Sequence, residues 1–84
     1  KIVLVDIGAD WCPPCRKMLP VLETLKKQSA NPFYFLAVDG GNDIDVMKAL
    51  HSEGLPTFVI FKNGKETWRH QGIVTLEDFN NALK

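Results

Sequence analysis

The two cysteines of the chain, Cys12 and Cys15, stand three positions apart between an apolar run and a helical pattern. The apolar run, residues 2–7, is rich in β-branched side chains and predicts a central strand that is covered on both faces. Residues 16–27 have the periodicity of a helix. A strand that delivers a Cys-x-x-Cys pair to the start of a helix is typical of redox chemistry.

The start of a helix gives the two cysteines different chemistry. Residues three apart in a first helical turn share a face, with Cβ atoms about 5–6 Å apart. Small adjustments bring such a pair within reach of a disulfide, whose Cα atoms lie about 4.4–6.8 Å apart. Free amides and the helix dipole favour an anion at this end, so we predict that Cys12 has a lowered thiol pKa and is the nucleophile. Cys15, one turn inside, is predicted to be the less exposed, resolving thiol.

Two other interpretations of the cysteine pair stay open at this point, an inert structural disulfide and half of a metal site. A structural zinc site needs four ligands. Only His51 and His70 could complete one, and their spacing fits no compact ligand pattern. We therefore expect no metal.

The rest of the chain alternates strand and helix patterns. We predict strands over residues 33–38, 57–62 and 65–71, a helix around residues 44–50 that Asn42 caps, and a last helix that begins at the capping box Thr75-x-x-Asp78. The Asn63-Gly64 pair is a strong hairpin signal between the last two strands. Pro20 has no N–H to donate to the carbonyl of Arg16, so a kink is expected in the first helix.

These elements follow the order β-α-β-α-β-β-α within one α/β domain, residues 1–84. Strands joined by a helix should run parallel with a right-handed crossover. The hairpin adds antiparallel strands. The predicted fold is therefore a four-stranded mixed sheet flanked by three helices.

Composition excludes several classes of partner. The net charge is zero, which gives no reason to expect binding to nucleic acid or to an anionic membrane. No apolar run approaches the ~20 residues that span a bilayer, so no membrane contact is expected from this segment. Because the chain starts with Lys1 and enters a strand at once, we expect a processed or excised piece. The cytoplasm and the bacterial periplasm both fit two cysteines, so the compartment is not predicted.

Two segments resemble signatures of the thioredoxin family. Residues 5–20, VDIGADWCPPCRKMLP, are similar to its active-site segment, and residues 54–64, GLPTFVIFKNG, to its second signature. Gly72 falls where a third family glycine is expected. The resemblance covers nearly the whole chain and implies a minimal thioredoxin fold, without the extra strand and helix that many thioredoxins carry first.

The resemblance implies thiol–disulfide exchange at Cys12 and Cys15, with no metal or organic cofactor. It also implies a role for Asp6, which stands six positions before the first cysteine, as a proton acceptor for Cys15. A carboxylate within an apolar strand is unfavourable unless it is hydrogen-bonded or protonated, so burial should raise its pKa towards the working pH. The plainer interpretation is an Asp that satisfies local backbone or marks a strand end. The family often has a lysine near this Asp on the next strand, and the aligned residue here is Phe35.

The resemblance also implies a surface that binds substrate. Gly-Leu-Pro-Thr is similar to the cis-proline loop of the family, so we expect a cis bond before Pro56 and a free backbone at Leu55 that pairs with an extended substrate. Trp11 and Pro13 flank the nucleophile and offer apolar contacts. The remaining predicted contacts are Gly72, whose lack of a side chain permits close approach, and its neighbour Ile73.

The leading functional hypothesis is a monomeric thiol–disulfide oxidoreductase that acts on protein disulfides or dithiols. We expect reduction rather than oxidation, because the active-site segment resembles the reducing branch of the family, and an unidentified partner must restore the redox state. One alternative is a specialised extracytoplasmic interchange domain, either oxidising or serving cytochrome maturation. Another is a non-catalytic binding domain that keeps the fold. The combination of the cysteine pair with Asp6 and Pro56 argues against the second.

Overall fold

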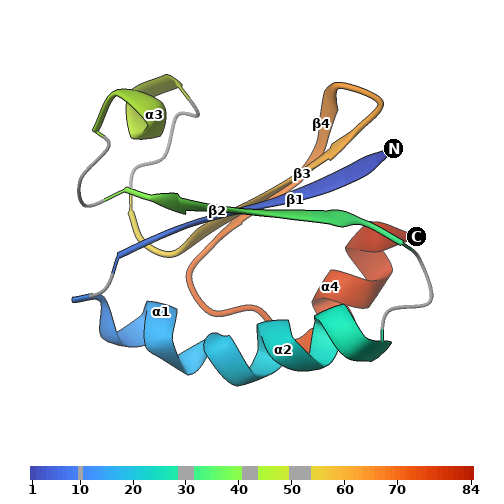
Figure 1. Ribbon diagram of the computed structural model, residues 1–84, viewed down its shortest axis with the longest axis horizontal. Coiled ribbons are helices and arrows are strands. Elements are labelled where there is room, and N and C mark those ends of the chain that lie inside the picture. Colours follow the sequence, from blue (N-terminus) through green and yellow to red (C-terminus); the bar gives the residue numbers. More distant parts are fainter. Residues whose placement is uncertain (10, 29–31, 41–43, 50–53) are drawn as a thin grey trace.

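The computed structural model describes residues 1–9, 11–28, 32–40, 44–49 and 54–84, and its elements follow the predicted order (Figure 1). They are β1 (Ile2–Gly8), α1 (Pro13–Lys17), α2 (Leu19–Gln28), β2 (Tyr34–Asp39), α3 (Ile44–Ala49), β3 (Thr57–Lys62), β4 (Lys65–Gln71) and α4 (Leu76–Leu83). The predicted first helix is present as α1 followed directly by α2. The predicted cap Asn42 lies outside the described residues.

The four strands form one mixed sheet in the order β2-β1-β3-β4. As predicted, β1 and β2 are parallel, and β3 and β4 form an antiparallel hairpin. The expectation that strands joined by a helix run parallel is wrong for β2 and β3, because β3 pairs antiparallel with β1. The connecting helix α3 has six residues and rises about 9 Å, whereas a strand of that length spans about 20 Å. It therefore does not return the chain to the far end of the sheet, and Thr57 begins β3 opposite Ile7.

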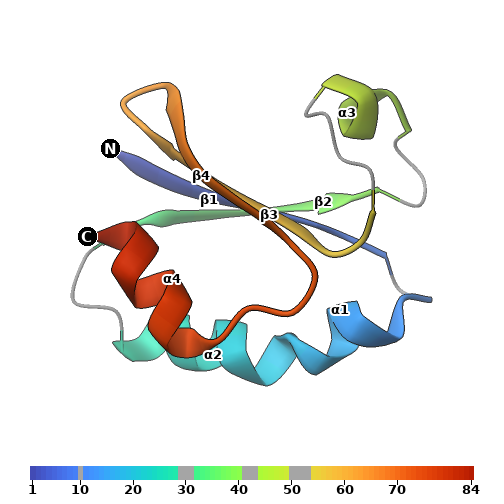
Figure 2. The same ribbon diagram turned by 180° about the vertical axis from the view of Figure 1, so that it is seen from behind.

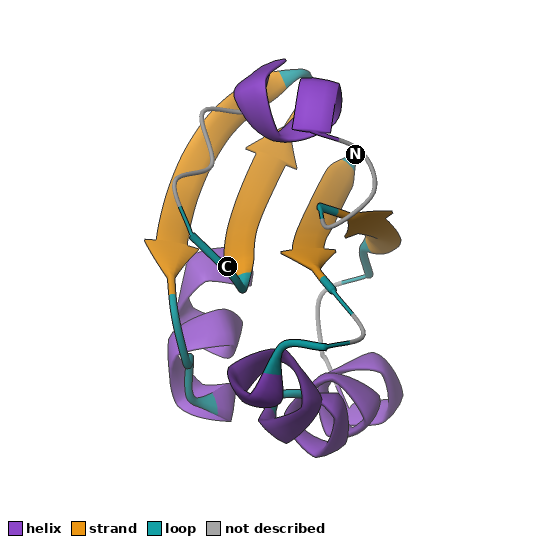
Figure 3. Ribbon diagram, turned by 90° about the vertical axis from the view of Figure 1, so that its left-hand side faces the viewer, coloured by secondary structure: helices purple, strands orange, loops and turns teal. Residues whose placement is uncertain are grey.

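The helices lie on both faces of the sheet. Figures 1 and 3 show α1, α2 and α4 on one face and α3 on the other. The main core fills the space beneath the first face and consists of Leu4, Met18, Leu22, Leu25, Phe58, Ile60, Val74, Phe79 and Leu83. A smaller cluster of Val5, Ile7 and Val59 lies on the other face. Because β1 contributes to both clusters, its nearly continuous apolar sequence is explained.

The kink predicted from Pro20 is confirmed. The N–H of Met18 donates to the carbonyl of Cys15 at 3.2 Å, a tight turn that ends α1. The helical pattern resumes when the N–H of Leu22 donates to the carbonyl of Met18 at 2.9 Å. The apolar side chains that face the core continue across the break, since Met18, Leu22 and Leu25 are all buried.

Local signals in the second half of the chain are confirmed as well. Asn63 and Gly64 have φ values of 54° and 83°, as a two-residue hairpin turn requires. The Thr75 side chain accepts a hydrogen bond from the N–H of Asp78 at 3.1 Å and so caps α4. Among the described residues, no helix is long and apolar enough to cross a bilayer.

Candidate active site

The two cysteines meet at the start of α1, as predicted. Cys12 is the N-cap residue and Cys15 lies in the first turn. They form a disulfide with Cα atoms 5.2 Å apart. The N–H of Cys15 donates to Cys12 Sγ at 3.3 Å. Since neither Pro13 nor Pro14 has an N–H, Cys15 supplies the amide that the start of this helix offers to the sulfur of Cys12.

The predicted order of exposure is wrong in this disulfide state. Cys12 is buried, with 4% of its surface exposed, whereas Cys15 is half-buried. The cause is an open groove of about 530 Å³ between α1 and the ends of β1 and β2, which Cys15 lines and Cys12 does not. One side of the pair therefore faces solvent through Cys15.

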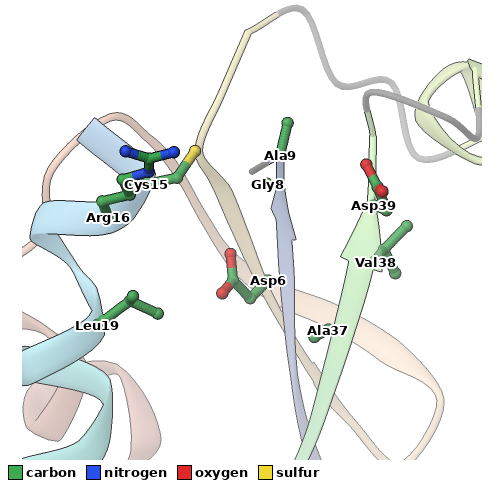
Figure 4. Close-up of a pocket in the computed structure, with 9 residues that line it drawn as sticks. All are labelled: Asp6, Gly8, Ala9, Cys15, Arg16, Leu19, Ala37, Val38 and Asp39. Carbon is green, nitrogen blue, oxygen red and sulfur yellow. The ribbon is translucent and has the colours of Figure 1, made fainter. Parts of the chain in front are cut away.

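Asp6 lines the same groove as Cys15 (Figure 4). The residue between them is Gly8, which lies two positions after Asp6 and on the same face of β1. A Cβ atom on Gly8 would lie 3.4 Å from Cys15 Sγ and 3.7 Å from Asp6 Oδ1. The glycine thus leaves the space that brings the sulfur and the carboxylate to one place.

The pKa of the Asp6 carboxyl is raised, as its position in an apolar strand predicts. Burial raises the pKa of Asp6 from 3.8 to about 6, and the positive charge of Lys26 lowers it by a smaller amount. Asp6 lies beside Phe58 of β3 and Ala37 of β2, neither of which offers a charge. A carboxyl with this pKa changes its protonation state near neutral pH and can accept a proton from a thiol.

The peptide bond between Leu55 and Pro56 is cis, as predicted. Pro56 is buried and its carbonyl accepts the N–H of Gly72 at 2.8 Å, which joins the start of β3 to the loop after β4. Figure 2 shows this loop passing beside α1 and α2 on its way to α4. Gly72 has a φ of 99°, a backbone conformation that favours glycine. Nothing lies within 4 Å of an added Cβ, and close approach of a substrate to this glycine stays a prediction.

The predicted apolar contacts with substrate are on the surface. Trp11 is 70% exposed and Ile73 is 55% exposed, two of the most exposed large apolar side chains in the described residues. Pro13 is exposed and Leu55 is half-buried. An exposed indole beside a disulfide is a flat surface that an extended peptide can cover.

The described residues contain no cluster of three or more His, Cys, Asp or Glu side chains that could hold a metal ion. His51 lies outside the described residues, and His70 is exposed on β4. His70 stacks on Trp68, with ring centroids 6.0 Å apart. The Trp68 ring also meets the ring of Phe79 in α4, with centroids 5.9 Å apart.

Sequence reasoning missed four residues around the groove. Arg16, Asp39 and Gly8 line it, and Lys26 acts on Asp6 from α2. Gly8 had a signal, because residues two apart in a strand share a face and a glycine there makes room next to Asp6. The other three depend on how α1, α2 and β2 pack, which no local pattern encodes.

Comparison with known proteins identifies the family. Residues 1–84 match the protein-family model described as thioredoxin. The chain belongs to the thioredoxin family. The X-ray structure of Fasciola hepatica thioredoxin superimposes with a TM-score of 0.87 at 31% identity, covering 100% of this chain and 82% of that one. The predicted family and thioredoxin fold are confirmed.

Thioredoxins of plants are among the similar sequences. Thioredoxin Y, chloroplastic, of Oryza sativa subsp. japonica is 38% identical over 72 residues, which are 86% of this chain and 43% of that protein. Thioredoxin H-type 1 of Nicotiana tabacum is 40% identical over 76 residues, which are 86% of this chain and 56% of that protein. The chain spans about half the length of the curated relatives it matches. Thioredoxins use an internal redox-active disulfide in place of an external cofactor, and Cys12–Cys15 stands in that position here.

Proposed function

We propose that the protein is a thioredoxin-type thiol–disulfide oxidoreductase that exchanges the Cys12–Cys15 pair with disulfides in other proteins. The observation that carries the proposal is the disulfide at the start of α1, with the Cys15 N–H donating to Cys12 Sγ. Family membership over residues 1–84 supports it. We further propose that the domain acts as a monomer and as a reductant.

The reduced protein would react in two displacement steps. In the first step the Cys12 thiolate attacks one sulfur of a substrate disulfide, the substrate S–S bond breaks, and the second substrate sulfur leaves as a thiolate. In the second step Cys15 gives its proton to Asp6 and attacks Cys12 Sγ. The mixed disulfide breaks, the Cys12–Cys15 disulfide forms, and the other substrate thiolate leaves. Two electrons pass from the cysteine pair to the substrate, and a redox partner must return them.

The geometry supports different roles for the two sulfurs. The sulfur of Cys12 receives an amide hydrogen bond at a helix start, an interaction that favours a thiolate. Cys15 instead faces the groove that Asp6 lines, with Gly8 leaving the space between them. We therefore propose that the carboxylate accepts the proton of Cys15 rather than that of Cys12, which the shared groove supports.

The surface around the disulfide suits an extended peptide. The exposed, largely apolar side chains here are Trp11, Pro13 and Ile73. Leu55 precedes the β3 ladder, which begins at Thr57, and we propose that its backbone pairs with substrate. Recognition through main-chain hydrogen bonds and a few apolar contacts fits a range of unfolded or flexible substrate segments.

A trapping experiment tests the proposal. The reduced Cys15→Ser variant should accumulate a mixed disulfide with an oxidised protein substrate, because the second step is blocked, and mass spectrometry would detect the adduct. The matched Cys12→Ser variant should form none. Exchange that survives both substitutions, or an adduct that forms only with Cys12→Ser, would contradict the assignment of the nucleophile.

A further inference from the structure

Lys26 projects from α2 towards the sheet rather than freely into solvent. Its Nζ lies 4.2 Å from the centre of the Phe35 ring in β2, which is a cation–π contact. Nζ also lies 3.7 Å from Oε1 of Glu23, one turn earlier on the helix. The side chain is 41% exposed. Contacts with the ring and the carboxylate hold the ammonium in one place over the edge of the sheet.

The Phe35 ring lies on the same face of the sheet as Asp6. Phe35 packs against the main core, as does Phe58, the β3 neighbour of Asp6. In β2, Ala37 lies directly beside Asp6, and Phe35 is two residues earlier. Phe35 and Asp6 are therefore diagonal neighbours on one face of two adjacent parallel strands, and the strand spacing and the rise of two residues place them about 8 Å apart. An ammonium above this ring is within electrostatic reach of the carboxyl.

Lys26 also lies on the face of α2 that turns towards the groove. Leu19, at the start of α2, lines the groove together with Asp6. Lys26 is seven residues later, two helical turns along the same face. Among the described residues, the charged side chains that line the groove with Asp6 are Arg16 from α1 and Asp39 from β2, and Lys26 from α2 lies beside Glu23.

We propose that Lys26 is a positioning residue for the proton of Asp6, because its ammonium on the Phe35 ring favours the carboxylate and keeps Asp6 able to accept a proton from Cys15. This rests on the role proposed for Asp6. The resemblance to thioredoxins implies that the family often has a lysine at the position that Phe35 occupies in this chain. In this chain the strand supplies the aromatic ring, and the facing helix supplies the positive charge. Burial raises the pKa of Asp6 and the charge of Lys26 lowers it. The lowering agrees with an ammonium that lies near the carboxyl.

Titration of the Asp6 carboxyl by NMR in the oxidised protein tests the inference directly. Lys26→Gln should raise the midpoint by about 0.3 pH unit, a twofold gain in proton affinity, for a partly exposed charge at this range. Lys27→Gln is the matched control, since Lys27 is the next residue of α2 and is exposed. Phe35→Leu should raise the midpoint as well, because the ring no longer holds the ammonium. A midpoint that moves no more in Lys26→Gln than in Lys27→Gln overturns the proposal.

The rate of mixed-disulfide resolution against pH separates this inference from the proposed function. In Lys26→Gln the rate profile should move to higher pH by the same interval as the titration. In an Asp6→Asn background, where resolution should already be slow, Lys26→Gln should change nothing further. The Asp6 midpoint could move in Lys26→Gln while the resolution rate of Asp6→Asn matches that of the unchanged protein across pH 6–9. That result would contradict the role of Asp6 in exchange. An Asp6 midpoint that stays the same in Lys26→Gln would contradict the role of Lys26.

Discussion

Replacing Asp6 with asparagine should stabilise the folded, oxidised protein at pH 8 and change its stability much less at pH 4. Burial raises the pKa of Asp6 from its ordinary value of 3.8 to about 6. Between these two pH values the folded state keeps a proton that the unfolded state has released. The free energy of unfolding therefore falls as the pH rises through this window. Above it, the folded protein carries the whole unfavourable effect of the buried charge, which asparagine lacks.

The size of the effect follows from the shift in pKa. A difference of about 2 pH units corresponds to about 3 kcal/mol if the carboxyl is fully enclosed. Asp6 is only half-buried and opens on the groove, so solvent screens part of the penalty and we expect a gain of about 1–2 kcal/mol. In a domain of this size such a gain raises the midpoint of thermal unfolding by about 5–15 °C.

Urea unfolding of the oxidised protein at pH 4 and pH 8 measures this difference. The exposed Asp45 of α3 provides a control, since Asp45→Asn should change the free energy of unfolding by less than about 0.5 kcal/mol at either pH. Equal gains for Asp6→Asn at both pH values would show that the gain does not come from ionisation. A loss at pH 8 would show that the carboxylate has stabilising partners that outweigh its burial, and the reasoning would fail.

Two further substitutions test individual contacts. A Cβ on Gly8 would already be in van der Waals contact with Cys15 Sγ at 3.4 Å and with Asp6 Oδ1 at 3.7 Å. The added methyl groups of Gly8→Val should therefore separate the two groups and slow resolution of the mixed disulfide by about tenfold. Stopped-flow fluorescence should find the first, Cys12-dependent step unchanged, and equal slowing of both steps would argue against a local effect. Thr75→Ala removes the 3.1 Å hydrogen bond to the N–H of Asp78 and should lower the free energy of unfolding by about 1 kcal/mol. Thr75→Ser should retain most of that stability in urea unfolding, and equal losses in the two variants would mean that the hydroxyl does not cap the helix.

The elements of this fold that could be predicted are those with a local cause. β3 ends and β4 begins where Asn63 and Gly64 adopt the positive φ values that their residue types favour. The first helix breaks near Pro20 because that residue lacks an N–H. The direction of β3 had no such local signal. It depends on whether α3 is long enough to carry the chain back across the sheet. The helical pattern of the sequence is the same whether the next strand is parallel or antiparallel.

The site divides in the same way. The spacing of Cys12 and Cys15 on one helical turn sets their distance, and an Asp in an apolar strand implies a raised pKa, so both could be predicted. The relative exposure of the two cysteines could not, because it depends on a groove between α1 and β2, which are remote in sequence. For Lys26, a surface position on a helix predicts only solvation, and its contact with Phe35 exists only after the crossover has brought α2 over β2.

The alternation of β1 explains how one strand can serve both core and site. Leu4, Asp6 and Gly8 occupy successive positions on the face of β1 that α1 and α2 cover. Leu4 is fully buried in the main core, and the missing side chain of Gly8 leaves space for Cys15. Asp6 lies between them, where burial is sufficient to raise its pKa and the groove still admits solvent and protons. The stability that is lost as the pH rises from about 4 to about 6 and the capacity to accept a proton from Cys15 therefore have one structural cause. A substitution that removes the first should also remove the second.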